Sequence, residues 1–354
     1  MRVMIGMSGG VDSSVAAALL HEQGHDVVGV TMRLWGGESD TGCCSVSDVD
    51  DARRVAQQIG IEHVVFNFAE EFNEHVVQPY VDAHQSGITP NPCIECNRHL
   101  KFERFAERAD ELGFDAVATG HHARIGTHTN GRLRLERGAD LAKDQSYVLH
   151  MVTAARLEHT SFPIGHMTKD EVRSHAARLG LRTAGKPDSQ DVCFISRADG
   201  REHFLGNRIP LRSARVVDRS GSQLGEVPSV EMVTLGQRRG LGVSGGGPVR
   251  YVIGVDVSDD EPTVVVGDAD DLLVSSQKVH STTWVDEPFE GDALAQTSAH
   301  GEPRPCRVTS IGDQELQIDW GLRSTRIAPG QSVVLYDPTN TWVIGGGIAE
   351  RSPL

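Results

Sequence analysis

The stretch Gly6-Met7-Ser8-Gly9-Gly10-Val11-Asp12-Ser13-Ser14 decides the fold of this chain of 354 residues. An apolar run at residues 2–7 leads into it, and a helical pattern at residues 13–23 follows it. Glycines between a strand and a helix let the backbone fold closely around an anion. The N–H groups at the helix start and the serine hydroxyls then supply donors. The stretch predicts a phosphate-binding loop at the head of an α/β domain.

This phosphate loop, residues 6–14, lacks the lysine of the P-loop motif GxxxxGK[ST], which disfavours γ-phosphate transfer in that style. A loop that offers only backbone and hydroxyl donors is better suited to hold pyrophosphate, the leaving group when AMP is transferred from ATP to a substrate. The dinucleotide fingerprint GxGxxG is missing, and a tight turn without a ligand is the remaining alternative. Asp12 either orders Mg²⁺ or caps the following helix. We favour the metal because Ser13 can cap equally well.

Outward from the loop, strand and helix patterns alternate over roughly the first 200 residues. Strands separated by helices of 10–15 residues are typical of a doubly wound parallel sheet. The expected strands are residues 2–7, 26–33, 63–68 and 114–119, and the expected helices are residues 13–23, 48–59, 96–112 and 168–179.

Beyond residue 205 the pattern changes to short β-branched runs between Gly, Pro, Asp and Ser turns. This predicts an all-β half, with two units that meet near residue 275. The predicted domains are residues 1–205 (PP-loop-type α/β), 206–275 (small central β domain) and 276–354 (C-terminal β-barrel). The expected strands are residues 214–218, 249–257, 263–266, 316–320 and 331–336.

The composition, with 38% hydrophobic and 23% charged residues, is that of an ordinary globular protein. No apolar run approaches the roughly 18 residues of a membrane span, and the start of the chain reads as a strand instead of a signal peptide. Six cysteines without an export signal indicate a reducing cytoplasm. The net charge of −15 speaks against indiscriminate nucleic-acid binding. Eight arginines against four acidic residues at 200–250 could still contact phosphates locally, although a solvated arginine face is the alternative.

Two cysteines stand three positions apart in the segment 89–97, just before a helical pattern, and Cys193 lies in the segment 188–195. Prolines fix the approach of the chain, and a helix N-terminus favours a thiolate. Three hypotheses compete for Cys93, Cys96 and Cys193. A zinc site lacks a second close pair of ligands, and a redox pair lacks thioredoxin-like flanks. In a sulfur-carrying pair, one thiolate holds a sulfane sulfur and the other resolves it.

Taken together, these motifs resemble the tRNA-specific 2-thiouridylase family, nearly from end to end. The phosphate loop resembles the PP-loop of the ATP pyrophosphatase superfamily, whose members activate an oxygen by attaching AMP. The first 200 residues match more closely than the β segments. The further matching segments are residues 42–45, 89–102, 118–124, 143–147, 191–195, 236–241 and 329–336, and a Gly-Gly-Gly-Ile run at 345–348.

The resemblance implies an ATP-dependent sulfurtransferase acting on uridine 34, the wobble base of tRNAs for lysine, glutamate and glutamine. The uracil C2 oxygen would receive AMP, and a sulfur anion would displace it, releasing AMP and pyrophosphate. By this likeness Cys96 is the nucleophile and Cys193 carries the persulfide, and the two can form a disulfide during turnover. A sulfur donor such as a cysteine desulfurase is the implied partner, and Mg²⁺ would accompany ATP.

The same resemblance assigns binding residues. For ATP they are Gly6, Met7, Ser8, Gly9, Gly10, Val11, Asp12, Ser13, Met32 and Gly120, with Asp12 also expected at Mg²⁺. For tRNA they are Asn91, Pro92 and Cys93 beside the target base, Lys143, Asp144 and Gln145, and Arg304 and Pro305. The β-rich half would grip the tRNA body through Arg238, Arg239 and Arg250.

Cys93 departs from the family pattern, because many relatives carry Asp there, suited to acid–base work beside the base. Its thiol leaves Cys93, Cys96 and Cys193 able to hold an iron–sulfur cluster on three corners, with the fourth iron open for sulfide. This cluster route is the alternative to the persulfide route, which we favour. Two other functions compete: a PP-loop amidotransferase or ligase, and a non-catalytic RNA-binding or iron–sulfur scaffold protein.

The other histidines and cysteines have simpler interpretations. His121 and His122 read as strand-end residues beside the nucleotide in preference to metal ligands, since no other ligand-spaced His or Cys accompanies them. At least one of Cys43 and Cys44 is expected to be buried packing, and Cys306 is expected to be structural.

Overall fold

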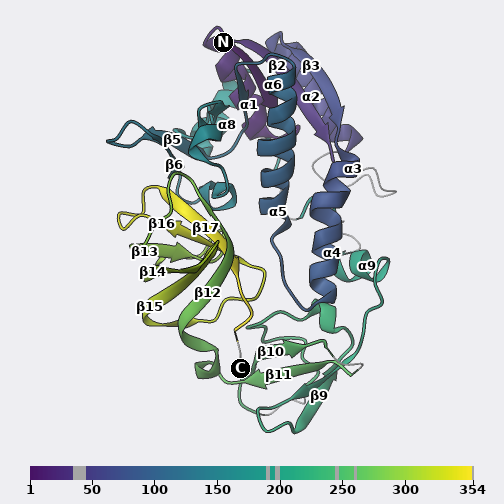
Figure 1. Cartoon of the computed structure of the whole chain (residues 1–354). Coiled ribbons are helices and arrows are strands. Elements are labelled where there is room, and N and C mark those ends of the chain that lie inside the picture. The colour runs from purple at the N-terminus through teal and green to yellow at the C-terminus, as the bar shows by residue number, and fades with distance from the viewer. Residues whose placement is uncertain (35–44, 189–191, 196–199, 244–246, 259–260, 353–354) are drawn as a thin grey trace.

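The structure is a computed structural model that describes residues 1–34, 45–188, 192–195, 200–243, 247–258 and 261–352. Within these residues a five-stranded sheet, a four-stranded sheet and a closed barrel follow one another along the chain, and a two-stranded hairpin is inserted before the last strand of the first sheet. Figure 1 shows long helices running from the first sheet towards the second, with the barrel beside them. The predicted α/β domain followed by all-β domains, one of them a barrel, is confirmed.

The first sheet has the strand order β3-β2-β1-β4-β7, and every neighbouring pair is parallel. The central strand β1 is buried on both faces after its first residue, as expected for a parallel sheet between two helical layers. The strand prediction for residues 26–33 matches the observed strand, and the others differ at their ends. The strands are β1 (Arg2–Gly6), β2 (Asp26–Arg33), β3 (Glu62–Asn67), β4 (Ala116–Ala118) and β7 (Thr160–Ser161).

Successive residues of β1 point to opposite faces of the sheet and enter two different cores. Val3 and Ile5 pack in the loop-side core, with α1 (Val11–Glu22), α2 (Val46–Ile59) and α8 (Lys169–Arg178). Met4 packs in the cysteine-side core, which also holds Cys96, Phe105 and Phe194. The helices of that second layer are α3 (Ala69–Phe72), η1 (Asn73–Val77), α4 (Gln78–Gln85), α5 (Pro92–Glu95), η2 (Cys96–Arg104), α6 (Phe105–Glu111) and α9 (Gly200–Gly206).

The central sheet has the order β10-β11-β8-β9 and its own apolar core. Its strands are β8 (Ala214–Val217), β9 (Gln223–Val227), β10 (Tyr251–Asp256) and β11 (Thr263–Gly267). His84 on α4 contacts the carbonyl of Glu231 at 3.1 Å, so this sheet is tied to the far end of the helical layer.

The barrel closes in the order β12-β15-β14-β13-β16-β17. Its last strand was not predicted, because three successive glycines give weak strand propensity. The structure explains them, since a Cβ at Gly345 would lie 2.4 Å from the carbonyl oxygen of Thr283 and one at Gly346 would lie 2.6 Å from that of Val333. The strands are β12 (Leu273–Trp284), β13 (Gly291–Gln296), β14 (Arg304–Gly312), β15 (Glu315–Thr325), β16 (Ser332–Tyr336) and β17 (Val343–Ala349).

The barrel packs against the α/β domain through a shared apolar cluster, the junction core. It combines residues such as Ile94, Leu135 and Tyr147 of the first domain with Val334 and Tyr336 of the barrel. The hairpin β5 (Ala123–Thr127) and β6 (Leu133–Arg137), which was not predicted, lies at this junction. The remaining short helices are η3 (Ser146–Leu149), α7 (Ala154–Leu157), η4 (Val230–Met232) and η5 (Asp270–Leu272).

The ranges 1–205, 206–275 and 276–354 stay a prediction as domain limits; the central sheet ends at Gly267 and the barrel begins at Leu273. A search of the described helices finds none with the length and apolar character to cross a membrane.

Candidate functional site

The phosphate loop connects the end of β1 to the first turn of α1. The hydroxyl of Ser13 accepts the N–H of Ser8 at 3.2 Å, and the hydroxyl of Ser14 donates to the carbonyl of Gly10 at 2.7 Å. Gly10 is the N-cap of α1, and no side chain caps this helix end, so Asp12 does not fill the capping role considered above. The first N–H groups of α1 therefore keep donor capacity for an anion.

Two glycines allow the close packing that shapes the loop. Gly9 has φ +71°, and a Cβ there would lie 2.4 Å from the carbonyl oxygen of Asp48 at the start of α2. Gly120 follows β4, and its Cβ would lie 2.6 Å from the backbone nitrogen of Ser13. Side chains at either position would push the loop away from its supports.

Asp12, in the first turn of α1, pairs with a lysine from a distant helix. The Nζ of Lys169 donates to both carboxylate oxygens at 2.8 Å, and the Nε2 of His122 lies 3.3 Å from Oδ1. Burial would raise the pKa of Asp12, but the hydrogen bonds from His122 and Lys169 outweigh it and the pKa is lowered. Asp12 is therefore ionised, and a buried ammonium stands beside a loop that carries no lysine.

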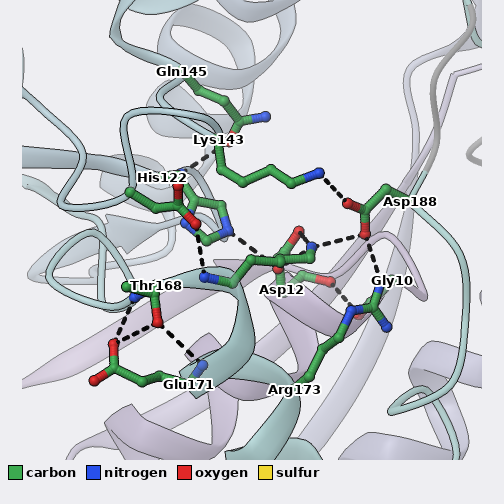
Figure 2. A network of polar contacts seen from close by, with 12 residues as sticks. Gly10, Asp12, His122, Lys143, Gln145, Thr168, Glu171, Arg173 and Asp188 are labelled. Atoms are coloured by element: carbon green, nitrogen blue, oxygen red, sulfur yellow. Dashed lines mark hydrogen bonds and ion pairs between the residues drawn. The ribbon is translucent and has the colours of Figure 1, made fainter.

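Asp188 also contacts Lys169, so it belongs to the same network of polar contacts as Asp12 (Figure 2). Its carboxylate lies 2.8 Å from Lys143, 2.8 Å from Lys169 and 3.0 Å from Arg173. Burial alone would raise the pKa of Asp188, but hydrogen bonds from Lys143 and Lys169 lower it to about 2. Three cations thus surround one carboxylate next to the phosphate loop.

Lys186 forms a second support below the loop. Its Nζ donates to the carbonyl of Gly9 at 3.0 Å and pairs with Asp48 at 2.6 Å and Asp51 at 2.9 Å. Burial would lower the pKa of Lys186, but the two carboxylates raise it, so the ammonium stays charged. The loop backbone is therefore fixed to α2 through a lysine.

The chemistry of the donor set fits Mg²⁺ only together with a ligand. Asp12 is a carboxylate in the loop, but both of its oxygens accept from Lys169 in this structure. Within the residues that the structure describes, no group of three or more His, Cys, Asp or Glu could hold a metal ion. Mg²⁺ commonly takes one or two carboxylates plus phosphate oxygens, so Asp12 with the phosphates of a nucleotide would suffice.

The first cysteine pair lies at the start of a continuous helix formed by α5, η2 and α6. Asn91 caps this helix, accepting the N–H of Cys93 at 3.1 Å. Cys93 is exposed, whereas Cys96 is 9% exposed and belongs to the cysteine-side core. The neighbouring Ile94 is buried in the junction core, so the segment is anchored on both sides.

Cys193 approaches the same core from a different part of the chain. The next residue, Phe194, is buried in edge-to-face contact with Phe72 and Tyr80, at 5.7 and 5.4 Å between ring centroids. Cys193 is half-buried and packs against the cysteine-side core that contains Cys96. The two predicted sulfur-handling residues, which lie 97 positions apart in the sequence, thus pack on the same apolar core.

A polar contact links the cysteine helix to the phosphate loop. The Nζ of Lys101, in the same helix as Cys96, lies 3.4 Å from the Nε2 of His121. His121 follows Gly120, whose backbone touches the start of α1. Met32, which was predicted near the adenosine, packs on the cysteine-side core, and its methyl group would lie 3.3 Å from a Cβ at Gly6. The predicted ATP site and the core that holds the predicted sulfur-handling cysteines therefore adjoin at Met32 and Gly6.

The remaining residues predicted at ATP, Met7 and Val11, have buried side chains. Met7 and Val11 are buried in the loop-side core. The carbonyl of Met7 accepts the hydroxyl of Thr31 at 2.9 Å. His121 is buried and hydrogen-bonded to Thr119 at 2.7 Å. Burial, Lys101 and His122 hold the pKa of His121 well below 6.5, which agrees with a neutral strand-end residue.

The predicted tRNA segment 143–145 divides into different environments. Lys143 is partly exposed and pairs with Asp188, as described above. The side chain of Asp144 is only 4% exposed and pairs with Arg137 at 2.6 Å. Gln145 is half-buried and accepts the N–H of His122 at 2.9 Å. Of the two charged residues in this segment, Lys143 is the more exposed, with 40% of its side chain accessible against 4% for Asp144.

The other predicted tRNA residues lie on the β domains. Arg304 and Pro305 begin the barrel strand β14, both exposed, and Arg304 donates to the hydroxyl of Ser324 at 2.7 Å. Arg238 and Arg239 are exposed in a loop of the central domain, and Arg250 is half-buried. Their use by a ligand stays a prediction.

Of the other cysteines, the structure describes Cys306. Cys306 is buried in the barrel core, and burial together with Asp292 raises the pKa of its thiol to about 12. Cys43 and Cys44 lie outside the described residues.

Sequence reasoning missed Lys169, Lys186 and Arg173, as well as the role of Asp188. The capping box formed by Thr168 and Glu171 marks the helix start, but not what its first side chain contacts. These residues lie more than 150 positions from the loop in sequence, and only the fold reveals that Lys169 and Lys186 contact it and that Arg173 and Asp188 join the same network.

Comparison with protein-family models finds three matches in chain order. They are the tRNA methyl transferase HUP domain at residues 1–197, the tRNA methyl transferase PRC-barrel domain at 202–268 and the aminomethyltransferase beta-barrel domain at 274–349. The first of these models alone covers more than half of the chain.

Relatives match over almost the whole chain. A tRNA-specific 2-thiouridylase MnmA of Chloroflexus aurantiacus is 44% identical over 99% of this chain and 98% of its own length. One of Mycolicibacterium vanbaalenii is 45% identical over 98% of both. A solved structure of the U34-tRNA thiolase NcsA from Methanococcus maripaludis covers 54% of this chain and 61% of its own, at 19% identity and a TM-score of 0.34, which is too low to bear on the site.

Proposed function

The chain belongs to the tRNA-specific 2-thiouridylase family, and on that premise we propose that it catalyses the ATP-dependent 2-thiolation of uridine 34 in tRNA. One observation carries the proposal. Cys96 and Cys193 pack on one core, and that core borders Gly6 at the start of the phosphate loop, where a Cβ would lie 3.3 Å from Met32 and 4.0 Å from Phe105. A single site can therefore attach AMP to the C2 oxygen of uracil and then deliver sulfur to the C2 carbon.

In the first step, the uracil C2 oxygen attacks the α-phosphorus of ATP and pyrophosphate leaves. The backbone donors at the start of α1 and the ammonium of Lys169 are suited to hold the phosphates. Mg²⁺, when bound with ATP, would neutralise phosphate charge, and Asp12 is the carboxylate that would hold it. Gly120 and Met32 are proposed at the adenosine.

In the second step, sulfur replaces the activated oxygen. A persulfide on Cys193 is the proposed sulfur carrier, and Cys96 is the proposed nucleophile that resolves it. The terminal sulfur attacks C2 and AMP leaves, so the base is joined to Cys193 through an S–S bond. The thiolate of Cys96 then attacks the Sγ of Cys193; this S–S bond breaks, the outer sulfur stays on C2 as 2-thiouridine, and the resulting Cys96–Cys193 disulfide must be opened by a cellular reductant.

The target base must leave the stack of the anticodon loop to reach these groups. Asn91, Pro92 and Cys93 are proposed to border it, because they stand at the open end of the cysteine helix. Lys143, Gln145, Arg304 and Pro305 are proposed contacts to tRNA. We extend the proposal to the tRNAs for lysine, glutamate and glutamine as substrates, to a cysteine desulfurase as sulfur donor and to the cytoplasm as the location.

The test is a thiolation assay with unmodified tRNA, ATP, Mg²⁺ and a sulfur donor, read by retardation in a mercury gel. Wild-type protein should give 2-thiouridine, and Cys96→Ser and Cys193→Ser should give none. Cys306→Ser is the matched control, because that buried thiol lies in the barrel core and should leave the yield unchanged. Lack of product with the wild type, or equal product with Cys193→Ser, would remove the proposal.

A further inference from the structure

Asp144 lies in the middle of a segment that resembles a tRNA contact, yet its carboxylate is buried. Oδ2 lies 2.6 Å from the Nη1 of Arg137, and the two side chains are 4% and 8% exposed. Oδ1 accepts the N–H of Gly138 at 2.9 Å and the N–H of Ser146 at 3.1 Å. Both oxygens therefore have partners inside the protein.

Arg137 continues the contact into the barrel. Its guanidinium donates to Asn340 at 2.7 and 2.9 Å and to Gln296 at 2.8 Å. It also lies 3.7 Å from the centroid of the Tyr336 ring. All three of these partners belong to the barrel, so one guanidinium connects it to the loop that carries Lys143.

A second link runs parallel to the first. The hydroxyl of Ser146 donates to Asp144 at 2.8 Å and lies 3.0 Å from the hydroxyl of Tyr336. The hydroxyl of Tyr147 donates to the carbonyl of Ser332 at 2.9 Å. The segment that follows Asp144 is thus bonded to two positions of β16.

We propose that Asp144 is a positioning residue that fixes the segment 143–145 to the barrel through Arg137 and does not itself touch tRNA. The proposal rests on the proposed function, in which Lys143 and Arg304 contact tRNA from the two sides of this junction. A junction that keeps their spacing constant lets one rigid tRNA meet both contacts without a further ordering cost. Direct contact with RNA would require Asp144 to leave the buried guanidinium of Arg137 without its carboxylate partner, which is strongly unfavourable.

The first measurement needs no RNA. Hydrogen exchange is followed in the full chain for the backbone of residues 138–147 and of β16, in the wild type and in Asp144→Asn. Loss of the ion pair should speed exchange in both segments together. The matched control is Asp286→Asn, which breaks a more exposed ion pair with Arg132 across the same junction and should leave both segments unchanged.

The second measurement is a double-mutant cycle on tRNA affinity. Asp144→Asn and Arg137→Met should each weaken binding by about 5- to 100-fold, the range of coupling between separate sites, and the double variant should be no weaker than the worse single one. ATP affinity should be unchanged. Gln296→Ala, a milder change on the barrel side, should reproduce part of the loss and serves if Asp144→Asn fails to fold.

Additive losses in the cycle, or unchanged exchange in Asp144→Asn, would overturn the proposal and return Asp144 to direct contact with tRNA. The thiolation assay on the wild type separates this outcome from failure of the proposed function. If the wild type thiolates tRNA while the cycle is additive, only the role of Asp144 is wrong. If it makes no 2-thiouridine, the function itself fails.

Discussion

The ammonium group of Lys169 donates to both carboxylate oxygens of Asp12 at 2.8 Å, and it reaches Asp188 at the same distance. Its side chain is 9% exposed. The phosphate loop has no lysine of its own, so we expect this cation from the first turn of α8 to contact phosphate as the P-loop lysine does. Asp12 and Asp188 hold it in position before any nucleotide arrives.

Lys169→Met should therefore weaken ATP binding. Loss of hydrogen bonds from a charged donor to phosphate costs about 1.5–3 kcal/mol, which corresponds to about 10- to 150-fold in affinity. Equilibrium binding of ATP and of inorganic pyrophosphate checks this, and Lys169→Arg should restore part of the affinity. The matched control is Arg178→Met on the same helix, which pairs with Glu22 on the far side and should bind ATP like the wild type.

Lys169→Met also leaves Asp12 and Asp188 with fewer partners, so a general loss of stability must be separated from loss of a ligand contact. Asp188→Asn added to Lys169→Met removes one negative charge and should recover thermal stability without recovering pyrophosphate binding. Recovery of both would mean that Lys169 serves only to neutralise the carboxylates.

Gly120→Ala should lower both ATP affinity and stability. The added methyl group would lie 2.6 Å from the backbone nitrogen of Ser13 and 2.8 Å from the carbonyl carbon of Asp12, so the start of α1 must shift. Overpacking of this kind costs about 1–3 kcal/mol. Gly185→Ala is the control, because a Cβ there meets no atom within 4 Å. Equal ATP affinity in the two variants would contradict the proposed place of the nucleotide.

The sequence was sufficient for features set by local pattern. The strand at residues 26–33 and the helix that begins near Thr168 follow from hydrophobic runs and a capping box. Relations between distant segments were not predictable, because hydrophobic periodicity says where a residue is buried and not what it meets. The pairing of Lys169 with Asp12, 157 positions away, is one case, and the burial of Asp144 behind Arg137 is another. In the second case the resemblance pointed to tRNA, whereas the structure supplies a partner inside the protein.

Acidification should destabilise the protein before its carboxylates titrate. His84 and His150 are buried, and burial lowers the pKa of each from 6.5 to about 4. Between pH 6.5 and about pH 4 the unfolded chain binds protons at these histidines that the folded chain does not bind. The free energy of unfolding therefore falls as the pH drops from 7 towards 4. Each histidine should contribute a loss of about 2 kcal/mol by pH 5. Denaturant unfolding at pH 7 and pH 5 measures the loss, which should be smaller in His150→Asn than in the exposed control His21→Asn; equal losses would contradict this assignment.

The role of Cys93 decides between the two sulfur routes. Its side chain is exposed at the first turn of the cysteine helix, whereas Cys96 is buried and Cys193 is half-buried, so the three thiols occupy unequal environments. In the persulfide route Cys93 does not hold the sulfur that is transferred. Cys93→Ser should therefore retain most of the thiolation activity, while Cys193→Ser retains none. Protein purified without oxygen should contain no stoichiometric iron. In the cluster route, Cys93→Ser would lose iron and activity together, because each thiolate holds one corner of the cluster. Stoichiometric iron and sulfide in an active wild-type sample, absent from an inactive Cys93→Ser sample, would therefore replace the persulfide route with the cluster route, and the rest of the site would still supply the adenylation step.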